Sequence, residues 1–134
     1  MSQSSDVKDD RRYTKDHEWA LVKNGQLVVG ISAFAVEQLG DITLVNWSVA
    51  PGESVTEGQV FGTIESVKTL SDLFAPVAGK VVELNAALEN APERVNEDCW
   101  EAGWMLVLAP ANPAAVEGLL KPAAYREHIA SLDH

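Results

Sequence analysis

Hydrophobic residues along this chain gather in short runs separated by turn-forming residues. The runs are rich in Val, Ile, Leu and Trp, and most are too short for a helix to bury one face. They lie at residues 19–23, 26–31, 41–49, 60–67, 69–75, 76–85 and 104–109. This pattern predicts a mainly β fold.

Two joins between these runs read as hairpins. Asn24-Gly25 separates residues 19–23 from 26–31, and both of its residues tolerate positive φ. Lys68 separates residues 60–67 from 69–75. Within 60–67 the alternation leaves polar and apolar residues on both faces, so the sequence does not decide which face points inward.

Helices are expected in two places. Residues 32–40 combine Ser32 as an N-cap with Gly40 as a terminator, which predicts a short helix near the N-terminus. Asn112-Pro113 predicts the start of C-terminal helices, interrupted at Lys121-Pro122. Residues 85–99 are polar and rich in turn formers, and no regular element is expected there.

The chain of 134 residues fits one domain with a tail. We expect residues 1–12 to form a disordered polar tail and residues 13–134 to form the folded domain, ending in the C-terminal helices. Similar turn-plus-strand segments at 50–55 and 75–84 flank Lys68. That repetition suits a small, two-fold-like sandwich or flattened barrel.

Ten basic and 20 acidic residues give a net charge of -10. This charge opposes binding to nucleic acid or to an anionic membrane surface. It suits docking on basic partner surfaces and equally suits solubility alone. No apolar run approaches the roughly 20 residues of a membrane span, and the N-terminus lacks the apolar centre of a secretory signal. We expect a cytoplasmic protein.

Side chains for other chemistry are sparse. Cys99 is the only cysteine, so no intrachain disulfide is possible. The three histidines lack metal-ligand spacing, and no metal site is expected. No nucleophile-and-base set can be argued from residue order, and we expect a protein that is not an enzyme.

Lys68 is the residue that stands out. It lies in ESVKTLSD (65–72), between two strand-forming runs and without a helical apolar stripe. A lysine at the crest of a hairpin can be reached by another enzyme from several directions. Covalent attachment of a cofactor needs that access.

Several blocks resemble the glycine cleavage system H protein family. They are YTKDHEW (13–19), VGISAFAVEQLGDI (29–42), FGTIESVKTLSDLFAPVAGKVVELN (61–85) and NEDCWEAGWM (96–105). The resemblance implies a lipoyl/biotinyl-type flattened barrel-sandwich with a short N-terminal helix and C-terminal helices. It also implies lipoic acid in amide linkage to Lys68. Thr69 replaces the family's usual Ala, Cys99 stands where a proline is common, and residues 45–55 depart from the usual acidic strand end.

The resemblance further implies a function. A lipoylated carrier of this family shuttles an aminomethyl group from glycine decarboxylase (P-protein) to aminomethyltransferase (T-protein), and electrons to dihydrolipoamide dehydrogenase (L-protein). Lipoate-attachment enzymes would be further partners, and we expect a monomer. The matching positions of the family's arm-docking cleft are Asp16, Glu18, Gln38 and Asp72. Acids facing one ammonium group are physically sensible there.

Three alternatives remain open. A biotin or acyl carrier domain is disfavoured because Val67 and Thr69, not Met, flank Lys68. A lipoyl relay that donates lipoate to other lipoyl-dependent enzymes would use the same attachment site. A purely interacting protein would leave Lys68 unmodified.

Overall fold

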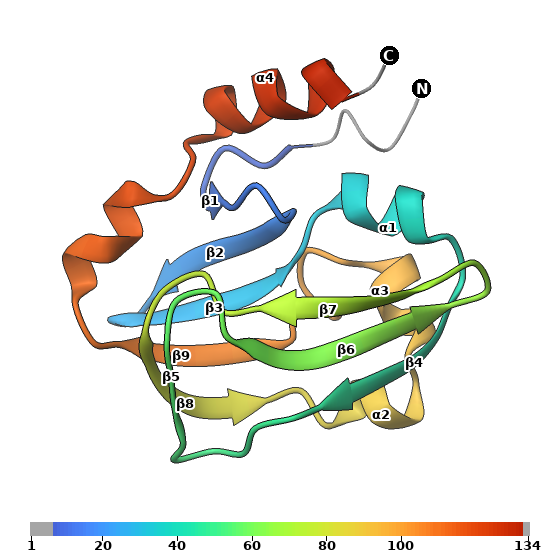
Figure 1. Ribbon diagram of the computed structural model, residues 1–134, viewed down its shortest axis with the longest axis horizontal. Helices are drawn as coiled ribbons and strands as arrows, with labels where there is room; N and C mark the ends of the chain where they lie inside the picture. The colour runs from blue at the N-terminus through green and yellow to red at the C-terminus, as the bar shows by residue number, and fades with distance from the viewer. Residues whose placement is uncertain (1–6, 133–134) are drawn as a thin grey trace.

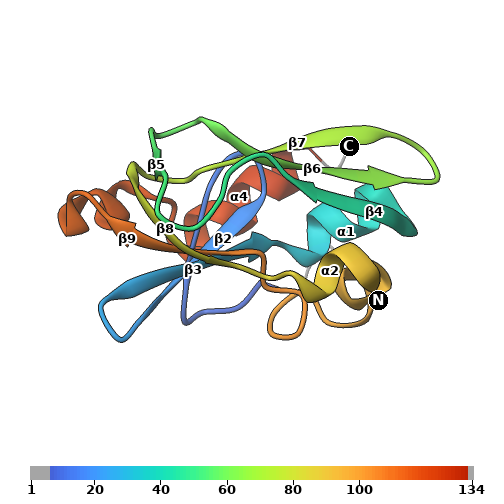
Figure 2. The ribbon, with the colours of Figure 1, turned by 90° about the horizontal axis from the view of Figure 1, so that it is seen from below.

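The computed structural model describes residues 7–132 and forms a sandwich of two antiparallel sheets (Figure 1). One sheet has six strands in the order β1-β2-β3-β9-β8-β5, and the other has three in the order β4-β6-β7. The strands are β1 Arg12–Tyr13, β2 Glu18–Lys23, β3 Gln26–Ile31, β4 Ile42–Trp47, β5 Ser54–Val55, β6 Val60–Ser66, β7 Leu70–Phe74, β8 Gly79–Leu84 and β9 Leu106–Pro110. Seen from below, the two sheets stack as separate layers (Figure 2). The expected mainly β, flattened barrel-sandwich is confirmed.

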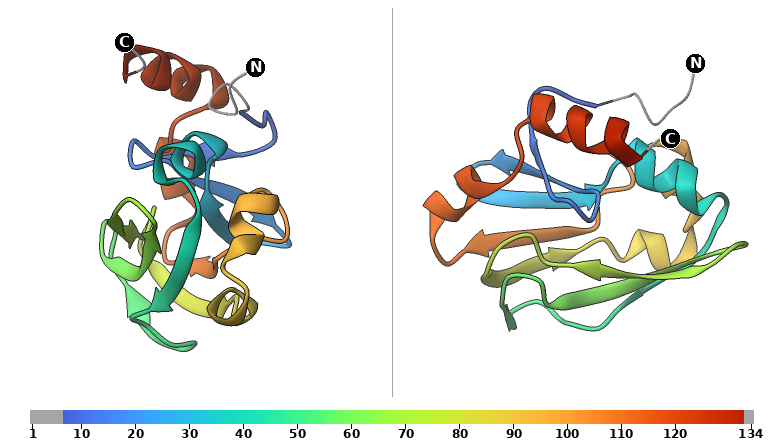
Figure 3. Two further views of the ribbon diagram at one scale, coloured as in Figure 1. Left: turned by 90° about the vertical axis from the view of Figure 1, so that its right-hand side faces the viewer. Right: turned by 45° about the horizontal axis from the view of Figure 1, so that its top comes forward.

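Four α-helices and one 3-10 helix complete the described part of the chain. They are α1 Ala33–Leu39, α2 Ala87–Asn90, α3 Glu93–Glu97, the 3-10 helix Pro113–Gly118 and α4 Pro122–Leu132. Helices α2 and α3 lie against β4, whereas α4 lies on the outer side of the six-stranded sheet near β1 (Figure 3). No helix in residues 7–132 is both long and apolar enough to cross a membrane.

The local signals for turns and caps act as expected. Asn24 and Gly25 both take positive φ, 55° and 77°, at the β2–β3 hairpin. Ser32 caps α1 by accepting a hydrogen bond from the Ala35 N–H at 3.3 Å. Asn112 caps the 3-10 helix in the same way through Ala114. The interruption at Pro122 separates that helix from α4.

Short helices were missed in the polar segment 85–99. Helices α2 and α3 are single turns there, and each has one buried side chain, Leu88 and Val95. Neither helix has a side-chain N-cap hydrogen bond. Tertiary packing of one apolar residue therefore supports each turn, and no periodic pattern marks it in the sequence.

The main hydrophobic core lies between the two sheets. A β-bulge determines which side chains of β6 point into this core. Gly62, Ile64 and Ser66 are buried, while Thr63 and Glu65 lie toward solvent. Phe61 is also fully buried, although strict alternation places it on the opposite face. The β6–β7 register shifts between Val60 and Gly62, and this bulge allows the consecutive residues Phe61 and Gly62 both to point inward.

A second hydrophobic cluster covers the outer side of β2 and β3. It contains Val7, Tyr13, Trp19, Phe34, Tyr125 and Ile129. The ring of Trp19 lies where a β-carbon on Gly30 would stand, so glycine is needed at that position. This cluster attaches α4 and the N-terminal segment to the domain.

The structure differs from the expected tail of residues 1–12. Val7 and Arg11 are buried, and the Arg11 guanidinium lies 4.6 Å from the Trp19 ring centroid. Arg11 also donates to the Trp100 carbonyl at 3.2 Å and pairs with Asp10. Packing thus extends at least to Val7, and residues 1–6 of the expected tail lie outside the described residues.

Candidate functional site

Lys68 lies in the turn between β6 and β7, and its side chain is exposed. Ser66 organises this turn, because its hydroxyl accepts the backbone N–H groups of Lys68 at 3.1 Å and Thr69 at 3.2 Å. The Ser66 N–H donates to the Thr69 carbonyl at 2.8 Å, which closes the hairpin. The turn therefore fixes the backbone of Lys68 and leaves its amine accessible.

The loop between α1 and β4 is hydrogen-bonded to the lysine turn. The Val67 N–H donates to the Asp41 carbonyl at 3.0 Å. Asn96 on α3 holds that loop at both ends: it donates to the Gly40 carbonyl and accepts from the Ile42 N–H, each at 2.9 Å. A β-carbon on Gly40 would lie 3.3 Å from Lys68 Cε, so glycine leaves room for the lysine stem.

A cavity of about 300 Å³ is lined in part by β7, the strand that follows the lysine turn, and it brings together all four predicted cleft residues. Asp16 and Glu18 come from the β1–β2 connection and the start of β2, Gln38 from α1, and Asp72 from β7. Asp16, Gln38 and Asp72 are exposed, whereas Glu18 is only 2% exposed. The rest of the lining consists of Lys15, His17 and Ser71 and the apolar side chains Ile31, Ala35, Leu39, Ile64, Leu73 and Phe74.

The distance from the lysine to this cleft can be followed along β7. Asp72 is four residues beyond Lys68, which corresponds to about 13 Å of extended strand. A lysine side chain extended by lipoic acid measures roughly 14 Å by bond lengths. An arm attached to Lys68 is therefore long enough to place its end among the acidic residues of the cleft.

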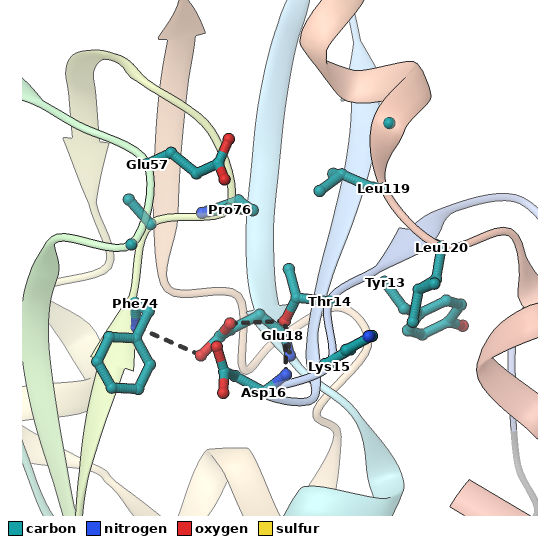
Figure 4. Close-up of a pocket in the computed structure, with 13 residues that line it drawn as sticks. Tyr13, Thr14, Lys15, Asp16, Glu18, Glu57, Phe74, Pro76, Leu119 and Leu120 are labelled. Carbon is teal, nitrogen blue, oxygen red and sulfur yellow. Dashed lines mark hydrogen bonds between the residues drawn. The ribbon is translucent and has the colours of Figure 1, made fainter. Parts of the chain in front are cut away.

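Glu18 has an unusual environment for a carboxyl group. Its two oxygens accept hydrogen bonds from the Thr14 hydroxyl at 2.8 Å and from the Phe74 N–H at 3.3 Å (Figure 4). Burial raises the pKa of Glu18 from 4.5 to about 8, and these two hydrogen bonds only partly oppose that rise. At neutral pH the carboxyl group is therefore mostly protonated.

A second cavity of about 240 Å³ lies on the other side of Glu18. It is bounded by Thr14 on the β1–β2 connection, by Glu57 and Pro76, and by Leu119 before α4 (Figure 4). Both cavities share Lys15, Asp16, Glu18 and Phe74. The Glu18 carboxyl group thus forms part of the wall between two hollows.

A buried polar network behind the cleft was missed by the sequence analysis. The Tyr125 hydroxyl, from α4, lies 2.8 Å from His17 Nδ1 and 2.7 Å from Ser32 Oγ. His17 also lines the cleft, and it takes a positive φ of 73°. Its partners are distant in sequence, so no local spacing could have revealed the network. The only signal for His17 in the sequence is its place in the YTKDHEW block (13–19), one of the blocks that carry the family resemblance.

Trp19 is not among the residues that line this cleft. Trp19 faces the other side of β2, where its Nε1 donates to the Cys99 carbonyl at 3.0 Å. Within residues 7–132, no three His, Cys, Asp or Glu side chains are grouped closely enough to hold a metal ion.

Comparison with known proteins gives one consistent family. The sequence profile described as "Glycine cleavage H-protein" matches residues 11–132. A "Glycine cleavage system H protein" of Anaeromyxobacter sp. (strain K) is 45% identical over 124 residues, covering 92% of this chain and 96% of that protein. One from Chlorobium luteolum is 52% identical over 120 residues, covering 88% and 93%. The crystal structure of a glycine cleavage system H protein from Mycobacterium marinum superposes with a TM-score of 0.82 at 36% identity, covering 96% of this chain and all of that one, 100%.

Proposed function

Because this chain belongs to the glycine cleavage H-protein family, we propose that it is the lipoylated carrier of the glycine cleavage system, with lipoic acid in amide linkage to Lys68 Nζ. The observation that supports this most is the placement of an exposed lysine, on a fixed turn, one arm length from an acid-lined cleft. Acylation removes the lysine charge, which takes the formal net charge from -10 to -11 (-10 minus 1).

The residues present fit such a group. The lysine stem has room over Gly40, and the apolar side chains Leu39, Ile64 and Leu73 suit the hydrocarbon part of the arm. When bound, the group supplies a disulfide that opens to take up an aminomethyl unit and, as a dithiol, gives up electrons. The chain itself provides the attachment point at Lys68, a cleft that can exclude water, and acidic residues near the aminomethyl unit, which is the cargo of the arm.

The proposed partners are three enzymes that use this arm in turn. Glycine decarboxylase would load the aminomethyl unit, aminomethyltransferase would remove it, and dihydrolipoamide dehydrogenase would accept the electrons. Each of these enzymes acts at the end of the arm. The enzymes that attach lipoate must instead reach Lys68 Nζ itself, which the open turn allows.

The cleft residues would hold the ammonium end of the cargo and exclude water from it. Asp16 and Asp72 lie at the rim of the cleft, and Glu18 lies deeper. An ammonium next to Glu18 favours its carboxylate form, so docking would release the proton that burial keeps on Glu18. Gln38 at the edge can donate or accept without adding charge.

Reconstitution of glycine decarboxylation tests the proposal. Lipoylated wild-type protein should support sustained glycine-dependent CO₂ release by the three partner enzymes, and the Lys68→Arg variant should not. Lipoylated protein that adds nothing to CO₂ release would contradict the shuttle. If that protein instead donates lipoate to other lipoyl-dependent enzymes, it is a relay.

A second assay tests the cleft. Hydrolysis of the cargo consumes one water and yields free thiol, formaldehyde and ammonium, so formaldehyde release reports how well the cleft protects it. Glu18→Gln should be lipoylated normally and should release formaldehyde faster than wild type. Equal release rates would remove Glu18 from the proposed function.

A further inference from the structure

Tyr125 on the C-terminal helix connects two segments that shape the cleft. Its side chain is fully buried, with an exposed fraction of 0%, and it is not among the residues that line the cleft. Its hydroxyl contacts His17 on the β1–β2 connection and Ser32 at the start of α1. Burial raises the pKa of Tyr125, so the hydroxyl keeps its proton and remains a donor.

His17 needs such support because of its backbone conformation. A φ of 73° is disfavoured for a residue with a β-carbon and persists where the surroundings hold it. The His17 N–H donates to the Thr14 carbonyl at 3.1 Å, and the His17 carbonyl accepts from the Ser32 N–H at 2.8 Å. The ring packs 4.7 Å from the Phe34 centroid and is fixed at Nδ1 by Tyr125.

The position of His17 gives this support a consequence for the site. It stands between Asp16 and Glu18, the two acids that the β1–β2 connection contributes to the cleft. Ser32, the other partner of Tyr125, begins the helix that contributes Gln38. The Tyr125 hydroxyl therefore contacts both segments that carry three of the four proposed cleft residues, namely Asp16, Glu18 and Gln38.

We propose that Tyr125 is a positioning residue for the arm-docking cleft: through His17 and Ser32, its hydroxyl holds Asp16 and Glu18 in place although it does not touch the arm. The proposal rests on the proposed function of the cleft. It assigns to the C-terminal helix α4 a role in protecting the cargo.

Tyr13 provides a matched control. It is as fully buried as Tyr125, and the two rings stack with centroids 4.4 Å apart. The Tyr13 hydroxyl, however, donates to the Lys8 carbonyl at 2.8 Å, in the N-terminal segment. Tyr13→Phe and Tyr125→Phe thus each remove one buried hydroxyl from the same cluster, but only Tyr125→Phe disconnects His17 and Ser32.

The first readout uses the unmodified protein. Backbone amide exchange should become faster at His17 and Ser32 in Tyr125→Phe by about fivefold, the factor expected for one lost hydrogen bond. Tyr13→Phe should leave these two amides at the wild-type rate. If Tyr125→Phe does not differ from Tyr13→Phe at these amides, the positioning role is overturned.

The second readout uses the lipoylated, loaded protein. Tyr125→Phe should release formaldehyde faster than wild type, whereas Tyr13→Phe should match wild type. A Tyr125→Phe rate equal to that of Tyr13→Phe, with Glu18→Gln still faster, would contradict the positioning role and leave the proposed function intact. If Glu18→Gln itself has no effect, the proposed role of the cleft fails instead.

Discussion

The pH dependence of stability offers a direct test of the buried Glu18. In the folded protein the pKa of Glu18 is about 8, against an ordinary value of 4.5. Between these values the folded state binds more protons than the unfolded state, so the free energy of unfolding decreases as the pH rises. This contribution is fully present below about pH 4.5 and is lost as the pH rises through 8.

The magnitude follows from the size of the shift. At about 1.36 kcal/mol per pKa unit, the stability lost between pH 5 and pH 8 is about 3 kcal/mol. Glu18→Gln removes the titration and keeps the shape of the side chain. Its carbonyl can still accept from the Phe74 N–H, and its amide can donate to the Thr14 hydroxyl.

Urea unfolding of both proteins at pH 5, 7 and 8 measures this effect. Subtracting the variant from the wild type cancels the other titrating groups, including His17, whose pKa is lowered by burial. We expect the difference to change by about 3 kcal/mol between pH 5 and pH 8, with the wild type losing stability. A difference that is constant with pH would refute the raised pKa of Glu18.

Three further substitutions test the framework around the site. Lys68→Arg should change the free energy of unfolding by less than about 0.5 kcal/mol, because the side chain is exposed, and urea unfolding checks this. Gly30→Ala should cost about 1–3 kcal/mol in the same assay, because its methyl group overlaps the Trp19 ring; Gly118→Ala, where a β-carbon meets nothing, is the control. Asn96→Ala should cost about 1–3 kcal/mol by leaving the Gly40 and Ile42 backbone groups without their partner, and an unchanged unfolding midpoint would contradict this.

Local signals in the sequence were sufficient for much of the sandwich. Asn24-Gly25, Ser32 and Asn112 each act through hydrogen bonds or dihedrals within a few residues, and the structure shows all three turns or caps. The pattern at 60–67 predicts a strand, but the inward face of that strand depends on a bulge at Val60–Gly62. A bulge is set by pairing with β7, which the run itself does not encode.

At the site, too, some features could be predicted from the sequence and others depend on the tertiary structure. Lys68 is marked by its own hairpin, and the family resemblance named Asp16, Glu18, Gln38 and Asp72, which the fold brings to one cavity. The protonated state of Glu18 could not be foreseen, because it depends on burial. Tyr125 could not be foreseen either, since it is 108 residues from His17 along the chain. Asn96 likewise acts on a loop 54 residues away.

The measurement that tests the central claim most directly is the intact mass of this protein purified from lipoate-replete cells, followed by peptide mapping. The account predicts a mass gain equal to one lipoyl amide, located on Lys68 and absent from Lys68→Arg. Protein that is unmodified at Lys68 under these conditions, or that is lipoylated at another residue, would contradict it.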